Sequence, residues 1–415
     1  MDAHAIGRRI AYWRERRRLT QADFGALMGK SRRWVQSLES GLRQADPRVS
    51  VLEDAARVLR IELSWLLTDR TDTERVDAAE LDRIRAVLQQ HDVITGTADP
   101  SCAPPLDIDT LRRRVAHGWQ SFQASAFGSL GRAVPDLLTE ANRAAARHTG
   151  EDQLAAYRAL SMALCLAEAT AIKYGSGDLA HIAGHRAVLA AERSGEPVIM
   201  ATAARHLTDA MTHHGQPHAA ADFATAAAER LGPDLLGAGP AGLSTLGMLY
   251  LKAAMAQATA ADRNDVRAAS AGHAVPALLD QADEHASQLG DDGDGNALFS
   301  AFGAANVSLY RLAAHVQLAE GAEGVTVALS MTAAEVDGLP RERRAHRLAD
   351  LAHAYALAGE RERAVDTLLD AEREAEQEVR ARPRTRQLVQ DLSLLGAGPA
   401  EARLRALGRR CGLPE

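Results

Sequence analysis

The sequence predicts an all-α protein, in which a small N-terminal unit of five short helices precedes a long array of antiparallel helix pairs. Hydrophobic residues make up 46% of the chain but aromatic residues only 4%. Alanine and leucine must therefore fill the interior, which favours closely packed helices over sheets. Apolar residues also recur at helical spacing between short Gly- or Pro-containing breaks. Because the 415 residues exceed what a single core supports, at least two folding units are expected.

Charge is distributed unevenly along the chain, whose formal net charge is -7. Residues 1–70 carry 14 Lys and Arg against 9 Asp and Glu, a net charge of +5, so the remainder carries -12. The basic end is the candidate for binding a polyanion. Three cysteines without CxxC spacing fit a reducing compartment. Charges interrupt every apolar stretch, so we expect a cytoplasmic protein without a membrane span.

The first two expected helices are marked by an apolar stripe and by a cap. Ile6, Ile10 and Trp13 fall at i, i+4 and i+7, which places them on one face. Thr20 precedes QADFGALM with Asp23 three positions later, a capping box that begins the second helix.

A turn and three further helices complete the N-terminal unit. Gly29 supplies a tight turn, and Ser31 caps RRWVQSLES, which directs Val35 and Leu38 inward. A fourth helix is expected to begin with a capping box and to bury four residues. The segment IELSWLL then ends the unit near position 67. The capping pair is Ser50 with Glu53, and the residues expected to be buried are Val49, Leu52, Ala56 and Leu59.

These segments resemble a known family of DNA-binding domains. LTQADFGALMGKSRRWVQSLESG, followed by VLRIELSWLL, is similar to the phage-repressor-like (XRE) family of helix-turn-helix regulators over residues 5–68. The resemblance implies that the second helix of the motif enters the major groove of double-stranded DNA, while the first crosses the backbone.

Carried over position by position, the resemblance implies two kinds of DNA contact. Arg32, Arg33 and Gln36 become base readers, and the arginines imply at least one G·C pair in each half-site. The expected phosphate contacts are made by Gln21, Ser31, Ser37 and Arg43. Trp34 departs from the family pattern and could pack over Arg32 or touch a thymine methyl. The alternative interpretation is a motif that mediates protein contacts, with the arginines as a solvated face.

The domain boundary is expected in two polar or proline-rich stretches, residues 68–75 and 95–105, which flank the amphipathic helix VDAAELDRIRAVLQQH. The predicted organisation is a DNA-binding domain at 1–70, a linker with one short helix at 71–105, and a helical domain at 106–415.

The C-terminal part shows the spacing of a tetratricopeptide-like α-solenoid. The segment 346–375 places seven residues at the positions of a 34-residue unit, and 205–233 is a weaker copy. The seven residues are Leu348, Leu351, Ala352, Tyr355, Gly359, Ala364 and Ala371; the weaker copy uses Leu207, Gly215, Ala220, Ala227 and Pro233. Stacked helix pairs present a concave surface suited to a peptide or a small molecule.

The two parts together resemble regulators of high-GC bacteria that join a phage-repressor-like domain to a tetratricopeptide-like array. The resemblance implies a homodimer on an inverted-repeat operator, with an array that senses a small molecule or peptide or serves for dimerisation. The alternative is an interaction scaffold in which the helix-turn-helix domain only tethers or recruits.

Two groups of residues are candidates for ligand binding. Arg205, Asp209 and His213 are projected onto the concave face of one helix, and Phe302, Asn306 and Tyr310 form a stripe on another. The alternatives are a surface ion pair for Arg205 and Asp209, and ordinary core packing with one satisfied asparagine for the Phe302 stripe.

Histidine-rich stretches give no strong metal motif. His181 and His185 lack the glutamate of an HExxH site, and the stretch from His206 to His218 spans an expected turn, so we expect solvated histidines. DDGDGN at 291–296 lacks the glycine and glutamate of a calcium loop and is interpreted as a turn. Because P-loop, dinucleotide-binding and GxSxG motifs are missing, we expect no cofactor, no metal and no enzymatic activity.

Overall fold

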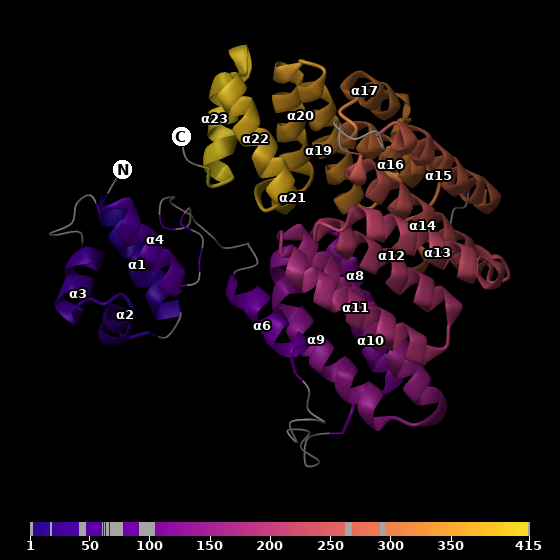
Figure 1. Ribbon diagram of the computed structural model, residues 1–415, viewed down its shortest axis with the longest axis horizontal. Coiled ribbons are helices and arrows are strands. Elements are labelled where there is room, and N and C mark those ends of the chain that lie inside the picture. The colour runs from indigo at the N-terminus through magenta and orange to yellow at the C-terminus, as the bar shows by residue number, and fades with distance from the viewer. Residues whose placement is uncertain are drawn as a thin grey trace. The chain divides into compact units, whose positions relative to one another are not determined.

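The computed structural model confirms the predicted all-α class, since every regular element among the described residues is a helix (Figure 1). The structure describes residues 3–16, 19–40, 47–59, 61, 63, 66, 78–90, 104–261, 268–290 and 295–413. The chain divides into two compact units, one formed by residues 1–73 with 402–415 and the other by residues 74–401.

Residues 1–73 of the N-terminal unit contain four described helices around one apolar core. They are α1 (Ala3–Arg16), α2 (Gln21–Leu27), α3 (Arg32–Ser40) and α4 (Val49–Leu59). The predicted stripe on α1 is confirmed, because Ile6, Ile10 and Trp13 are all buried in this core. Leu66 from the closing segment is also buried there. Most of the expected fifth helix lies outside the described residues.

The predicted start of the fourth helix is wrong, although most of its buried face is right. α4 begins at Val49, so Ser50 lies inside the helix and not at its N-cap. Val49 is 62% exposed, while Leu52, Ala56 and Leu59 are buried as expected. A boundary error of one or two residues is typical of weak caps.

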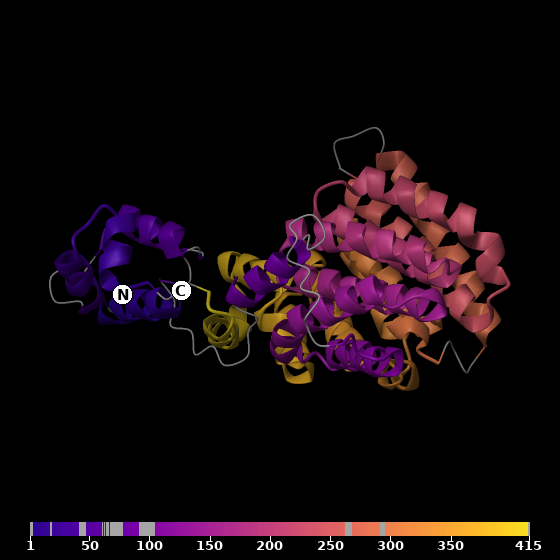
Figure 2. The same cartoon turned by 90° about the horizontal axis from the view of Figure 1, so that it is seen from below.

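The second unit is an array of helix pairs, whose members alternate between its inner and outer sides (Figures 1 and 2). The inner helices are α8 (Ile108–Gln123), α10 (Gly150–Lys173), α12 (Pro197–His213), α14 (Gly239–Ala260), α16 (Ala304–Gln317) and α19 (Arg341–Leu357). Their partners are α9 (Phe127–Arg147), α11 (Gly177–Ser194), α13 (Pro217–Leu236), α15 (Ala268–Leu289), α17 (Gly321–Ser330) and α20 (Arg361–Glu374). Each inner helix also packs against the next inner helix along the array.

Shorter elements complete the array and the C-terminus. These are η1 (Ala297–Phe299), α18 (Ala333–Asp337), α21 (Glu376–Arg380), α22 (Pro383–Leu395), η2 (Gly398–Ala400) and α23 (Glu401–Arg410).

Both predicted repeat units form antiparallel helix pairs. The stronger one is α19 with α20, joined through Gly359, whose φ of +83° suits glycine. The weaker copy is α12 with α13, joined through Gly215 at φ +85°. The small buried residues Ala352 and Ala364 let the stronger pair approach closely.

Helix α6 (Ala78–Leu88), which the sequence placed in a linker, packs against α9 and α11 of the array. Ile84 and Leu88 are buried in the same core as these helices, and Arg85 donates a 2.6 Å hydrogen bond to Asp178. The array therefore includes this helix.

The array curls far enough to bring distant parts of the sequence together. α8 contacts α19, and Lys173 at the end of α10 pairs with Glu342 on α19 and Glu378 on α21. The inner helices thereby surround a cavity. α10 is also the one described helix long and apolar enough to match a membrane span, but 72% of its apolar window is buried inside the fold, as expected of a core helix.

Candidate functional site

The helix-turn-helix geometry of the N-terminal unit follows from its caps and glycines. Thr20 Oγ1 accepts from the Asp23 amide at 3.1 Å and Asp23 accepts from the Thr20 amide, so the predicted capping box that begins α2 is confirmed. Gly29 has a φ of +65°, which ends α2 and reverses the chain. At Gly25, an added Cβ would lie 2.9 Å from the carbonyl oxygen of Lys30, so only glycine lets the turn come this close.

Helix α3 has an apolar face on one side and a basic face on the other. Val35 and Leu38 are buried in the domain core. Arg32, Arg33 and Gln36 are exposed on the opposite face. Because no described residue forms an ion pair or hydrogen bond with the two guanidinium groups, both can meet base edges.

The expected phosphate-contact residues differ in how available they are. The Ser31 hydroxyl caps α3 by accepting from the Trp34 amide at 3.2 Å, and Ser37 donates to the Arg33 carbonyl at 3.0 Å. Trp34 is half-buried, and the ammonium group that lies over its ring, at 5.7 Å, belongs to Lys30. Arg43 lies outside the described residues.

Gln21 is held by a buried polar cluster. Its amide donates to Glu39 Oε2 at 2.8 Å, and Arg14 donates to the same carboxylate through Nε at 2.6 Å. The Arg14 and Glu39 side chains are only 8% and 7% exposed. Glu39 sits at the C-terminal end of α3, so this cluster fixes the angle between the two helices of the motif. No local sequence pattern indicates this role.

The second candidate site is the cavity inside the array, with a volume of about 400 Å³. Its walls come from the inner helices α8, α10, α12, α14, α16 and α19, together with the start of α22 and with Phe299. The cavity lies entirely within residues 74–401, which form one compact unit.

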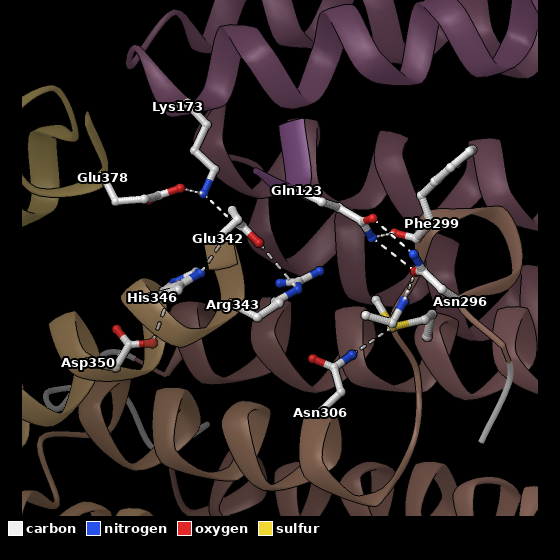
Figure 3. Close-up of polar contacts among 12 residues, drawn as sticks. Gln123, Lys173, Asn296, Phe299, Asn306, Glu342, Arg343, His346, Asp350 and Glu378 are labelled. Carbon is white, nitrogen blue, oxygen red and sulfur yellow. Dashed lines mark hydrogen bonds and ion pairs between the residues drawn. The ribbon is translucent and has the colours of Figure 1, made fainter. Parts of the chain in front are cut away.

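Four of the six predicted ligand residues line this cavity, and two do not. Arg205, Asp209, His213 and Tyr310 face it. Phe302 packs against the backbone of Gly247, where an added Cβ would lie 2.1 Å from its ring. Asn306 is fully buried and donates to the Met248 sulfur at 3.5 Å, with its Oδ1 unpartnered among the described residues (Figure 3). Core packing, the alternative given for this stripe, describes these two residues.

The expected surface ion pair between Arg205 and Asp209 is absent among the described contacts. Asp209 instead accepts from Lys252 Nζ of α14 at 2.6 Å. Burial opposes ionisation of Asp209, but the Lys252 ammonium and His213 hold its pKa below the ordinary value. Arg205 is only 4% exposed and makes no hydrogen bond or ion pair with any described residue. Burial lowers its pKa, and the neighbouring Arg343 acts in the same direction.

A three-residue charge cluster closes the cavity where α10 meets α19 and α21. Figure 3 shows Lys173 between Glu378 and Glu342, with the distance to Glu378 Oε1 being 2.5 Å. Burial disfavours the charged form of Glu342, yet Lys173 and Arg343 hold its pKa at about 2. Burial raises the pKa of Glu378. Because the three residues are far apart in sequence, no local pattern could reveal the cluster.

A buried acid and base pair, which no local sequence pattern indicates, joins His206 of the cavity lining to Glu168 of α10. Glu168 Oε2 is 2.6 Å from His206 Nδ1, and the residues are 1% and 5% exposed. Burial raises the pKa of Glu168 and lowers that of His206. Both shifts favour a protonated Glu168 that donates to a neutral imidazole. His206 therefore contradicts the expectation of solvated histidines.

One wall of the cavity is aromatic and is built on unusual backbone. Phe299 stacks on Trp119 with ring centroids 5.8 Å apart and an interplanar angle of 6°. Asn296, Leu298, Phe299 and Ala301 all have φ between +49° and +60°, a conformation that non-glycine residues rarely adopt. Gln123 holds this segment by exchanging two 2.9 Å hydrogen bonds with the Asn296 side chain (Figure 3).

The histidines at 181 and 185 join His214 in a packed cluster. The His181 ring lies 4.5 Å from each of the other two rings, measured between centroids. Within the described part of the chain, no three His, Cys, Asp or Glu side chains are arranged to hold a metal ion.

Comparison with known proteins agrees with the N-terminal geometry. Residues 10–66 match the family model described as Helix-turn-helix. The chain is also similar to a solved structure, described as the crystal structure of Bacillus thuringiensis PlcR in complex with the peptide PapR7 and DNA. The identity is 14%, the match covers 69% of this chain and 96% of that one, and the TM-score is 0.29. No curated protein matches the chain.

These observations define the class of the N-terminal domain and the architecture that follows it. The N-terminal unit is a helix-turn-helix domain of the phage-repressor-like type, followed by a tetratricopeptide-like helical array. Residues 10–66 thus form a DNA-binding domain of the helix-turn-helix class.

Proposed function

We propose that the protein is a sequence-specific transcription regulator that binds an inverted-repeat operator as a homodimer and whose array cavity binds a small-molecule effector. The observation that carries the DNA-binding part is the exposed pair Arg32 and Arg33, without partners among the described residues, on a helix fixed by its buried opposite face. Guanidinium groups presented in this way form bidentate contacts with guanine O6 and N7.

The basic face lies next to groups that can fix the domain on the DNA backbone. Ser31 is exposed at the N-terminus of α3, where amides and the helix dipole favour a phosphate. The carboxylate of Glu39, which would repel phosphate, is neutralised by its ion pair with Arg14 and also accepts a hydrogen bond from Gln21. Positioning and base reading can therefore be separate tasks of neighbouring residues.

The cavity favours a small molecule over an extended peptide as the effector. Its volume of about 400 Å³ lies within the usual range of small-ligand sites. The inner helices surround it on several sides, and the Lys173 cluster closes the junction of α10 with α19 and α21. The cavity lies within residues 74–401, whereas the proposed DNA-reading helix α3 belongs to the other compact unit.

Selection of bound fragments from random DNA tests the DNA-binding part directly. We expect enrichment of two half-sites related by a dyad, each with at least one G·C pair, with half-site centres about 34 Å or a multiple apart. Binding that was equal on selected and random DNA would contradict the proposal and support the scaffold alternative.

The effector part is tested by measuring operator affinity with and without each compound that binds the array. A ligand can shift a conformational equilibrium only through its different affinities for the two states, and a complete switch needs about 5.5 kcal/mol. An operator affinity that no cavity ligand changes would disprove the coupling.

A further inference from the structure

The array cavity carries an excess of positive charge. Seven Arg and Lys side chains line it, against three Asp and Glu side chains. Glu378 adds one more negative charge from just outside the lining, through its pair with Lys173. Even then, three positive charges remain without a matching acid among the described residues. An enclosed excess of this size is unfavourable unless a ligand compensates for it.

Arg205 is the centre of this excess. Its side chain is almost completely buried and faces the cavity from α12, yet no described residue accepts a hydrogen bond from it. The nearby acids are engaged elsewhere, since Asp209 accepts from Lys252 and Glu168 contacts His206. A guanidinium offers five donors in a fixed fork that matches a carboxylate or a phosphate. Arg205 therefore lacks the partner that its chemistry requires.

Two other arginines, on helices that line the cavity, support the same conclusion. Arg384, at the start of α22, also makes no hydrogen bond or ion pair with the described residues. Arg343 of α19 is 3.5 Å from Glu342, which is already held by Lys173. Positive groups therefore face one another across the cavity from three helices.

The remaining wall sets the shape of the rest of the ligand. Phe299 lines the cavity and is backed by Trp119 in a parallel stack. Phe122 and Met255 extend the apolar surface. A flat apolar group could lie against this wall while a charged group lies toward Arg205.

We propose that the cavity binds a small organic acid, with a carboxylate or phosphate held by Arg205 and a flat apolar part against Phe299. This inference rests on the proposed function in that it names the chemical class of the effector. Carboxylic acids and phosphate esters both fit this description, because each carries an anionic oxygen group on an apolar body.

Binding of three compounds that share one ring system tests the inference, with 2-naphthoate and 2-naphthyl phosphate as the anions and 2-naphthalenemethanol as the neutral analogue. Calorimetric titration of the full chain should give an affinity for at least one anion about tenfold or more above that of the alcohol. The two anions distinguish a carboxylate ligand from a phosphate ligand. Equal affinity for all three, or no binding of either anion at roughly millimolar concentration, would overturn the inference.

Substitution of Arg205 identifies the group responsible. Arg205→Met keeps the length of the side chain and should remove the preference for the anion while leaving binding of the alcohol nearly unchanged. Arg205→Lys should keep part of the preference, and Arg384→Met offers a second test if Arg205→Met alters the fold. The matched control is Arg230→Met, at an exposed position on α13. An equal anion preference in Arg205→Met and Arg230→Met would contradict the assignment.

The direct titration separates this inference from the proposed function. If the anions bind through Arg205 but no compound alters operator affinity, the effector role fails and the ligand class stands. If the neutral compound binds equally well and does alter operator affinity, the ligand class is wrong and the effector role stands.

Discussion

Three arginines of this chain show how surroundings decide the role of one residue type. Arg14 is buried against Glu39, Arg33 is exposed on α3, and Arg205 is buried without a partner among the described residues. A guanidinium remains charged at all physiological pH values, so each must be paired, solvated or reserved for a ligand. The buried ion pair of Arg14 stabilises the domain. The exposed Arg33 supports the proposed binding of DNA, and the buried Arg205 supports the proposed binding of an acid.

Arg33→Ala should remove sequence discrimination rather than general affinity for DNA. The loss on the selected operator should be about 1 to 3 kcal/mol, with much less change on random DNA, because a base contact is removed. Fluorescence anisotropy on both DNAs at fixed salt measures the two losses. Arg57→Ala is the control, since Arg57 is exposed on α4 and pairs with Asp54. Equal losses on both DNAs would contradict the base-reading assignment.

Arg205→Met should increase the stability of the ligand-free protein. Removal of a buried charge without a partner relieves a desolvation cost of about 1 to 3 kcal/mol, and the methionine retains most of the packing. Denaturant unfolding followed by circular dichroism measures the change. A clear loss of stability would show that Arg205 makes stabilising contacts, which would weaken its assignment to a ligand.

Residue spacing predicted part of the cavity, but residue partners could not be predicted. The i, i+4, i+8 pattern correctly placed Arg205, Asp209 and His213 on one face of α12. It could not show that Asp209 pairs with Lys252, which lies 43 residues further along the chain. The same periodicity also fits a core-facing stripe, so spacing alone does not separate Phe302 and Asn306 from residues that face the cavity.

At the scale of single elements, the sequence predicts helix boundaries where a capping box or a glycine marks them. The Thr20 and Asp23 box begins α2 as expected, and Gly215 and Gly359 terminate helices in the left-handed conformation. Segment 296–301 had no comparable signal, because none of its left-handed residues is glycine. Its conformation is imposed by tertiary contacts with Gln123 and Trp119, which local sequence cannot reveal.

The contact between α1 and α3 depends on Gly7. An added Cβ at this position would lie 2.4 Å from the Glu39 carbonyl oxygen and 2.6 Å from that of Leu38, and backbone atoms cannot move aside easily. Gly7→Ala should therefore destabilise the N-terminal unit by about 1 to 3 kcal/mol. Because α3 is the proposed DNA-reading helix, operator affinity should fall as well.

A second glycine substitution provides the control for this effect. Gly232 lies inside α13, and no described atom lies within 4 Å of the position that a Cβ would occupy there. Gly232→Ala should stabilise the array by about 0.5 to 1 kcal/mol, because alanine favours the helix. Thermal unfolding of both variants measures the difference, and a neutral Gly7→Ala would show that the two helices can separate without cost.

At the scale of the whole molecule, the sequence predicted stacked helix pairs but not their closure. The curvature of an array results from small rotations repeated at every pair, which are set by many side-chain contacts. Whether α8 meets α19 therefore cannot be read from any one repeat. Sequence reasoning missed Lys173, Glu342, Trp119 and Lys252 as cavity residues for this reason.

The closed array buries titratable groups whose effects on stability can be separated by pH. Burial lowers the pKa of His346 well below its usual value and that of His353 to about 4, with Arg382 and Arg384 acting in the same direction. Glu168 and His206 together hold one proton in the folded state. They also hold one when unfolded between about pH 4.5 and 6.5, so the pair contributes little pH dependence in this range.

Stability should therefore decrease as the pH falls from about 6.5 to 5. In this range the unfolded chain binds protons at His346 and His353 while the folded chain does not, which costs up to about 1.4 kcal/mol per pH unit for each histidine. The burial of His181 and His285 acts in the same direction. Urea unfolding at several pH values measures the slope. His353→Gln should reduce this slope, whereas His117→Gln, at an exposed position on α8, should leave it unchanged. A slope that His353→Gln does not alter would mean that protons enter the closed array without unfolding it.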